Sequence, residues 1–237
     1  METAALIALG IAGAALGAGL RPQAGALWRK LWKHERPVSP DQRARWALLG
    51  ELDAQGALDD RVVLWGDSLF QQGEWEALLT GTARVANRGV SGDRSEHLAA
   101  RVARGGAERA RRHVVLIGVN DWWHSEGRRD LLGTTETIDG LARELAQHGA
   151  AVHLLEPLPI AQAGPNAELA PLRRELERRA ADAPWQWVPT AGLFGDAEGR
   201  LRRELSRDGI HLSVDGYRVL AGCVAELDPE LSVRAGF

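Results

Sequence analysis

The chain has a single cysteine, Cys223, among its 237 residues. This excludes an intrachain disulfide and a zinc site built on cysteines. Basic residues are not in excess either, because 29 Lys and Arg stand against 32 Asp and Glu, a net charge of −3. Proteins that hold nucleic acid by its phosphates need a basic surface, so we expect no nucleic-acid partner. The 45% apolar and 26% charged residues are typical of a folded soluble domain.

Long apolar runs are also scarce, and the one exception lies at the N-terminus. Residues 4–20 carry no charge, and as a helix they would span roughly 25 Å of a ~30 Å hydrocarbon core. Basic residues and tryptophans follow the run, as at a membrane–water boundary: Arg21, Trp28, Arg29, Lys30, Trp32, Lys33 and Arg36. We therefore expect residues 1–36 to anchor the protein in a membrane, with residues 37–237 on the cytoplasmic side. The alternatives are export to the periplasm, with the segment as an atypical signal, and an Ala/Gly helix packed on a soluble protein.

Residues 37–237 have the pattern of one α/β domain. Short apolar runs predict five strands, at residues 61–65, 83–87, 113–117, 151–155 and 185–188. Helical periodicity separates them, for example at Ile138, Leu141, Ala142 and Leu145, and a helix is expected over residues 41–55. A last helix is predicted from Tyr217, Leu220, Ala221, Val224 and Leu227. Strands that alternate with helices indicate a mostly parallel sheet covered on both faces.

Residues that a hydrolase needs follow three of these predicted strands and precede the last helix. Ser68, a possible nucleophile, follows the first strand, and Gly92, whose backbone N–H a ligand can approach closely, follows the second. Asn120, a side-chain donor, follows the third. Asp208 and His211 precede the last helix, and their spacing lets the carboxylate orient the imidazole as a base. Because loops at the carboxyl ends of parallel strands meet at one edge, we expect these groups to meet.

Four short stretches carry a family resemblance: GDSL at 66–69, NRGVSGD at 87–93, GVND at 118–121 and DGIHLSVDGY at 208–217. Together they resemble the SGNH (GDSL-type) serine hydrolases over about residues 60–228. The resemblance implies a flavodoxin-like three-layer α/β/α sandwich with a five-stranded parallel sheet. It implies Ser68 as the nucleophile, His211 as the base and Asp208 as its orienting partner. The oxyanion hole would be formed by Ser68, Gly92 and Asn120, and no metal or other cofactor is implied.

Several aspects of the function stay open at this stage. The substrate is expected to be a carboxylic ester, of an acyl lipid, a lysophospholipid or a small molecule. Carbohydrate O-deacetylation and a catalytically silent, membrane-tethered binding module are the alternatives. Trp122 and Trp123 follow Asn120-Asp121 and either wall a substrate pocket or cover the sheet edge. Asp67 and Asp93 are expected to fix loops by hydrogen bonds and to take no part in catalysis, because Asp favours turns. The sequence does not indicate an oligomeric state.

Overall fold

A computed structural model describes residues 38–123 and 131–235 of the chain. The predicted anchor, residues 1–36, lies outside these ranges and stays a prediction. Within the described ranges, no helix is long and apolar enough to cross a membrane.

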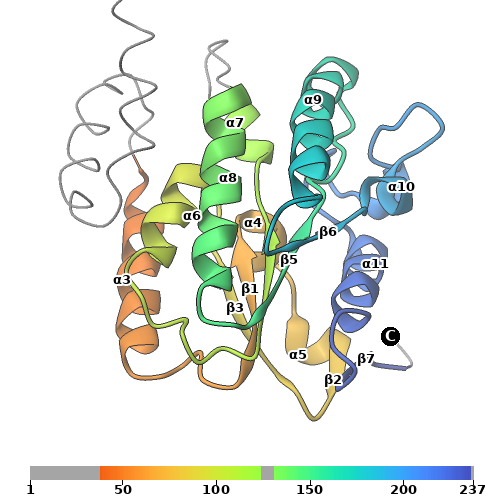
Figure 1. The fold of residues 1–237 in the computed structure, drawn as a ribbon. Helices are drawn as coiled ribbons and strands as arrows, with labels where there is room; N and C mark the ends of the chain where they lie inside the picture. Colours follow the sequence, from red (N-terminus) through yellow and green to blue (C-terminus); the bar gives the residue numbers. More distant parts are fainter. Residues whose placement is uncertain (1–37, 124–130, 236–237) are drawn as a thin grey trace, which may run out of the picture. The chain divides into compact units, whose positions relative to one another are not determined.

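The centre of the fold is a five-stranded parallel sheet (Figure 1). Its strands are β3 (Arg84–Gly89), β1 (Arg61–Gly66), β4 (Arg112–Leu116), β5 (Ala151–Leu155) and β6 (Gln186–Val188), in that order across the sheet. All four neighbouring pairs run parallel. Taken in chain order this is the 2-1-3-4-5 arrangement of flavodoxin-like folds, in which ligands bind where the strand order reverses. Here that point lies between β1 and β4. The predicted fold class and all five predicted strands are confirmed.

Successive side chains of each strand enter two different cores. Val63 and Trp65 of β1 face one apolar cluster, whereas Val62 and Leu64 face the other. The alternation follows from the two-residue period of a strand. Because both faces are buried, the strand is apolar from Val62 to Trp65, which is why its short run could be recognised in the sequence.

Helices cover both faces of the sheet (Figure 1). One core is closed by α6 (Ser95–Val102), α8 (Leu131–Ala146) and α9 (Ala163–Ala180). The other is closed by α4 (Ser68–Gln71), α5 (Trp75–Leu78), α10 (Ala191–Phe194) and α11 (Val214–Ala225). The short helix α7 (Val119–Trp123) follows β4, and the 3-10 turn η1 (Arg203–Leu205) precedes α11.

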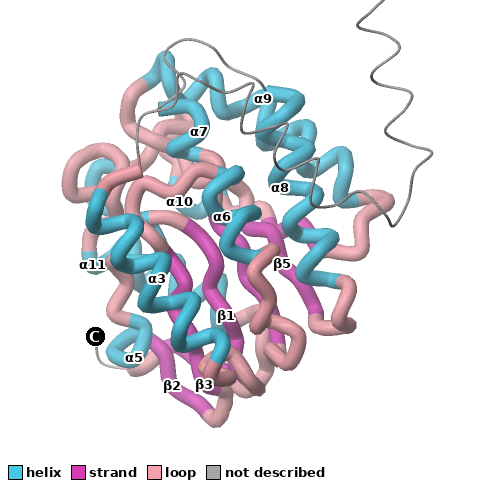
Figure 2. The backbone as a smooth tube through the Cα atoms, turned by 90° about the vertical axis from the view of Figure 1, so that its left-hand side faces the viewer, coloured by secondary structure: helices cyan, strands magenta, loops and turns pink. Residues whose placement is uncertain are grey.

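One more helix, α3 (Pro40–Ala54), lies beside the edge strand β3 and next to α6 (Figure 2). It begins with a capping box in which Ser39 and Gln42 satisfy each other's backbone N–H groups, with Pro40 in the first turn. The helix is joined to β3 by Arg88, whose Nε donates to Asp53 Oδ1 at 2.7 Å. It therefore stands close to the loop that follows β3.

Two short strands were not predicted. β2 (Leu79–Gly81) pairs antiparallel with β7 (Leu231–Val233). Three residues are too few to show an alternating pattern, and the partners are far apart in the sequence. The predicted last helix, α11, ends at Ala225, before Leu227. Leu227 still packs against the core that α11 closes.

Candidate active site

Ser68 is placed by the turn between β1 and α4. It is the first residue of α4, and the N-cap residue Asp67 accepts a hydrogen bond from Leu69 N at 2.9 Å. Asp is a preferred N-cap because its side chain satisfies a backbone N–H that has no partner within the helix. Ser68 is only 6% exposed. The sequence around Ser68 therefore fixes the hydroxyl directly beyond the end of the strand.

A tight turn before α11 holds His211. Oδ1 of Asp208 accepts from the backbone N–H groups of Ile210 and His211, at 3.0 and 2.8 Å. Oδ2 of the same carboxylate lies 2.6 Å from His211 Nδ1. One side chain thus fixes both the backbone of the turn and the orientation of the ring. Burial opposes ionisation of Asp208, but the hydrogen bonds from His211 and Ile210 prevail and lower its pKa to about 2.

The His211 ring joins Asp208 to Ser68. Its Nε2 lies 3.2 Å from Ser68 Oγ, across 143 residues of sequence. The three side chains form a continuous Ser–His–Asp chain, with each pair within hydrogen-bond reach. This is the geometry in which a histidine can take a proton from a serine hydroxyl while a carboxylate stabilises the ring.

Two backbone N–H groups in the loops that follow β1 and β3 have no acceptor among the described residues. They are the N–H groups of Ser68 and Gly92. Gly92 has φ +80°, a conformation that L side chains rarely adopt, and an added Cβ would lie 3.2 Å from Gln42 Nε2. The backbone of this turn therefore requires glycine.

The side chain of Asn120 is held between two acceptors. Its Nδ2 donates to the carbonyl oxygen of Asp93 at 2.9 Å and to Asp67 Oδ2 at 3.3 Å. These bonds join α7 to the loops that follow β3 and β1. The structure thus brings the predicted site residues to the carboxyl edge of the sheet, and Asp67 and Asp93 make the hydrogen bonds expected of them.

The Asp93 side chain is fixed by a buried array of hydrogen bonds from Arg101, Trp46 and Gln42, which the sequence did not indicate. Asp93 is fully buried, and Arg101 of α6 donates to its Oδ2 from both Nε and Nη2, at 2.9 and 2.8 Å. Trp46 Nε1 and Gln42 Nε2 of α3 donate to its Oδ1, at 3.0 and 3.4 Å. Burial nevertheless raises the pKa of Asp93. The chain has 29 Lys and Arg, so composition alone could not identify Arg101 as the partner.

Two further carboxyls lie near Asn120, the buried Asp67 and the half-buried Asp121. Burial raises the pKa of Asp67 to about 7, and the nearby carboxyls of Asp93 and Asp121 add to the shift. Burial also raises the pKa of Asp121 to about 6, although hydrogen bonds from Ser95 act to lower it. Among the described residues, Asp67 has no Lys, Arg or His within ion-pair distance. A buried carboxyl without a cation is unusual and is typical of functional sites.

The predicted substrate-binding tryptophans remain untested. Trp122 Nε1 donates to Glu168 Oε2 at 2.9 Å, which ties α7 to α9, and its ring packs against the first core. The side chain of Trp123 lies outside the part of the chain that the structure describes. Trp122 therefore has a structural contact, and its contact with a substrate stays a prediction.

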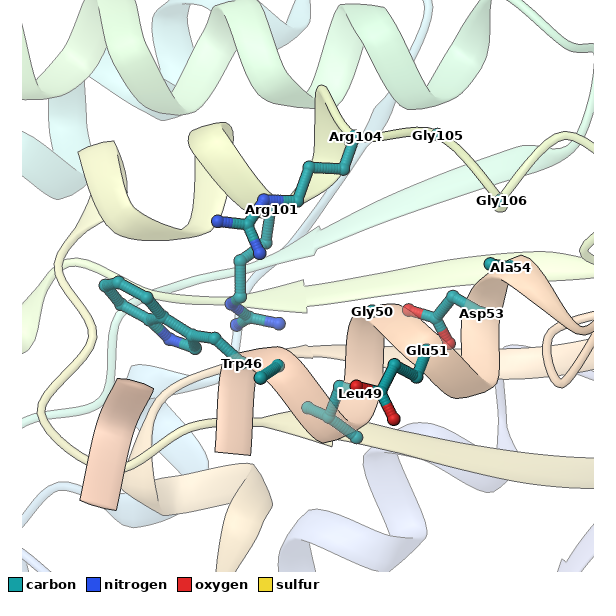
Figure 3. A pocket seen from close by; sticks show the side chains of 11 residues that line it. Trp46, Leu49, Gly50, Glu51, Asp53, Ala54, Arg101, Arg104, Gly105 and Gly106 are labelled. Atoms are coloured by element: carbon teal, nitrogen blue, oxygen red, sulfur yellow. The ribbon is translucent and has the colours of Figure 1, made fainter. Parts of the chain in front are cut away.

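A cavity of about 410 Å³ lies away from Ser68, between α3 and the end of α6 (Figure 3). Trp46, Arg101 and Arg104 point toward it. The Arg101 guanidinium is already occupied by Asp93, Arg88 O and Gly66 O. Arg101, in the wall of this cavity, therefore supports the loops of the active site. In the part of the chain that the structure describes, no cluster of His, Cys, Asp and Glu could hold a metal ion.

The fold and the Ser–His–Asp chain define an α/β/α hydrolase. The sequence model of the GDSL-like lipase/acylhydrolase family matches residues 54–219, well over half of the chain. The protein belongs to this family and is a hydrolase that acts on ester bonds.

Solved structures show the same fold. A protein from Streptococcus pneumonia is 20% identical with a TM-score of 0.70, covering 79% of this chain and 92% of its own. A GDSL-like lipase from Bacteroides thetaiotaomicron is 18% identical with a TM-score of 0.64, and the match covers 77% of this chain and 97% of the lipase chain. An acetyl xylan esterase from Geobacillus stearothermophilus is 22% identical with a TM-score of 0.58, covering 70% and 93%. No curated protein matches the sequence.

Proposed function

We propose that the protein hydrolyses carboxylic esters through an acyl-enzyme on Ser68. The observation that carries this proposal is the contact of Ser68 Oγ with His211 Nε2 at 3.2 Å, continued from His211 Nδ1 to Asp208 Oδ2 at 2.6 Å. A serine hydroxyl is a poor nucleophile at neutral pH and needs such a base beside it.

Acylation begins when Ser68 Oγ attacks the ester carbonyl carbon and its proton passes to His211 Nε2. The imidazolium that forms is stabilised by the Asp208 carboxylate, which is ionised at any pH well above its pKa of about 2. The tetrahedral intermediate collapses with loss of the alkoxide, which takes the proton from Nε2 and leaves as an alcohol. The acyl group is now bound to Ser68 Oγ.

Deacylation repeats the sequence with water as the nucleophile. His211 Nε2 takes a proton from water, the hydroxide adds to the acyl carbon, and Ser68 Oγ leaves with that proton. In both halves the carbonyl oxygen becomes negatively charged. The backbone N–H groups of Ser68 and Gly92 and the Asn120 amide would stabilise this charge, and loss of one such donor typically costs roughly 10²–10³ in kcat.

An ester of an acyl lipid, a lysophospholipid or a small molecule is the first choice of substrate, and a carbohydrate O-acetyl ester is the alternative. The fold is shared with a GDSL-like lipase and with an acetyl xylan esterase, and similarity at this level does not favour one over the other. The complete Ser–His–Asp chain argues against a catalytically silent binding module.

A panel of p-nitrophenyl esters of increasing acyl length, assayed beside acetylated xylan, tests the function. The proposal expects release of p-nitrophenol by the wild-type protein and none above background by Ser68→Ala. A maximum at medium or long chains supports an acyl-lipid substrate, and activity confined to acetyl esters supports the alternative. Equal activity of wild type and Ser68→Ala would contradict the proposal.

We also propose that residues 1–36 tether the enzyme to a membrane, with its active site on the cytoplasmic side. The support is the uncharged run at 4–20 and the basic stretch behind it. Full-length protein should sediment with membranes, and a chain that begins at residue 37 should be soluble and active. Recovery of the full-length protein in the soluble fraction would contradict the tether. Digestion of the catalytic domain in intact spheroplasts would contradict the cytoplasmic orientation and support export.

A further inference from the structure

We infer that Asp67 is a positioning residue that acts through Asn120, holding the Asn120 amide with its NH₂ group directed into the active site. The inference rests on the proposed function, because it assigns Asn120 to the stabilisation of the carbonyl oxygen. It assigns Asp67 a second role besides capping α4.

The two oxygens of the Asp67 carboxyl group have different hydrogen-bond partners. Oδ1 accepts from Leu69 N at 2.9 Å and caps the helix. Oδ2 plays no part in the cap and instead lies 3.3 Å from Asn120 Nδ2. Ser or Asn would cap the helix about equally well. The second carboxyl oxygen is therefore needed for Asn120 and not for the helix.

The orientation of the Asn120 amide depends on its neighbours. A primary amide has a donor end and an acceptor end of nearly equal size, and its hydrogen-bond partners decide which end faces which way. Both neighbours of Nδ2, the Asp93 carbonyl and the Asp67 carboxyl, are acceptors. Rotation of the amide by 180° would place Oδ1 against the Asp93 carbonyl oxygen and, above the Asp67 pKa of about 7, against an ionised carboxylate. Asp67 thus helps to exclude the orientation that could not stabilise an oxyanion.

The two contacts of Nδ2 differ in length. The 2.9 Å bond to Asp93 O is of ordinary length, whereas the 3.3 Å contact to Asp67 Oδ2 is long. The hydrogen on the Asp67 side is therefore the one that a substrate oxygen can take over or share. Asp67 holds this hydrogen in place until the intermediate forms, so that only this one long contact has to shift at that moment.

Burial of the Asp67 carboxyl group contributes little to the stability of the folded state. Asp67 is 1% exposed and, among the residues that the structure describes, has no cation beside it. Burying a carboxyl without a cation opposes folding. Asp228, by contrast, is equally buried but is paired with Arg111 and Arg112 at the start of β4. A residue that opposes folding and contacts Asn120 is best explained by a role in the reaction.

A double-mutant cycle of Asp67→Asn and Asn120→Ala tests the inference. Steady-state kinetics with p-nitrophenyl butyrate give kcat and KM, and labelling by a fluorophosphonate gives a rate that does not depend on the choice of ester. Asp67→Asn keeps the helix cap but replaces one acceptor by a donor. We expect kcat and the labelling rate to fall roughly 10- to 100-fold, with KM changed less than about twofold. In the Asn120→Ala background the same substitution should change kcat by less than about twofold.

Two further variants make the result specific. Asp67→Ser also caps α4 but is too short to reach Asn120, so it should reproduce the loss if Asp67→Asn folds poorly. Asp228→Asn weakens a buried ion pair at the opposite end of the sheet. It should lower the melting temperature and leave kcat unchanged, which separates stability from positioning.

The outcomes are distinct. Full kcat in Asp67→Asn, or an equal fractional loss with and without Asn120, would overturn the inference, because a merely structural role acts equally in both backgrounds. A wild-type protein that neither cleaves esters nor reacts with the fluorophosphonate would instead refute the proposed function.

Discussion

The backbone carbonyl of Asp93 accepts a hydrogen bond from Asn120 Nδ2 at 2.9 Å, and this contact joins the loop after β3 to the helix after β4. The Asp93 side chain is in turn held by Arg101 of α6 and Trp46 of α3. A side chain in the proposed oxyanion hole is thus connected, through one residue, to two helices outside the active site. The sheet brings the loops together, and this buried array fixes their relative positions.

Arg101→Met is expected to destabilise the protein because it leaves the Asp93 carboxylate buried without a cation. Breaking one side of a buried pair costs about 3–5 kcal/mol. Urea unfolding at pH 7 measures the loss. Adding Asp93→Asn, which removes the charge and can still accept from Trp46, should recover part of it. If the two single losses simply add in the double variant, the pair does not act as a unit.

Asp208→Asn is expected to reduce kcat/KM by roughly 10³–10⁴-fold without unfolding the turn. The asparagine Oδ1 can still accept from Ile210 and His211, as the Asp208 Oδ1 does. Its NH₂ group, however, would face His211 Nδ1 and favour the tautomer that has its proton on Nε2. Initial rates and circular dichroism of the same preparation check both statements. A rate within tenfold of wild type would show that Asp208 does not orient the ring.

Asp67→Asn is expected to stabilise the protein at neutral pH, although it slows catalysis. Burial raises the pKa of Asp67 to about 7 in the folded state, from about 4 in an unfolded chain. Between these values the folded protein retains a proton that the unfolded chain has released. Asp67 therefore makes the wild type less stable as the pH rises, by up to about 1.4 kcal/mol per pH unit.

The measurement is the melting temperature of both proteins from pH 4.5 to pH 8. The melting temperature of Asp67→Asn should exceed that of the wild type, by a margin that grows across this range and levels off above the pKa of Asp67. The carboxyls of Asp93 and Asp121 and the buried hydroxyl of Tyr217, which interact with Asp67, are present in both proteins. A difference that does not depend on pH would show that Asp67 is ionised in the folded state throughout this range.

The sequence predicted the centre of the sheet well because β1, β4 and β5 are buried on two faces and therefore form short apolar runs. Val62 to Trp65 of β1 illustrates this, since all four side chains are buried. The β2–β7 pair could not be predicted in the same way, because it joins three-residue segments about 150 residues apart. Long-range pairing of this kind leaves no local periodicity.

The residues of the candidate site were recognisable because they lie in short motifs behind the strands. What the sequence could not show is what holds them. Arg101 and Trp46 have no motif, and their roles follow only from the packing of α6 and α3 against the loop at Asp93. Asp67 lies within a motif, yet its contact with Asn120 spans 53 residues. Hydrogen-bond partners distant in sequence are set by the tertiary fold.

The most direct test of the account is the site of covalent labelling by a fluorophosphonate, located by peptide mass spectrometry. Such probes react with a serine only when an adjacent base activates it. We expect one adduct per chain, on Ser68, and no adduct in Ser68→Ala or His211→Ala at the same probe concentration. An adduct on another residue, or undiminished labelling of Ser68→Ala, would contradict the assignment of Ser68 as the nucleophile.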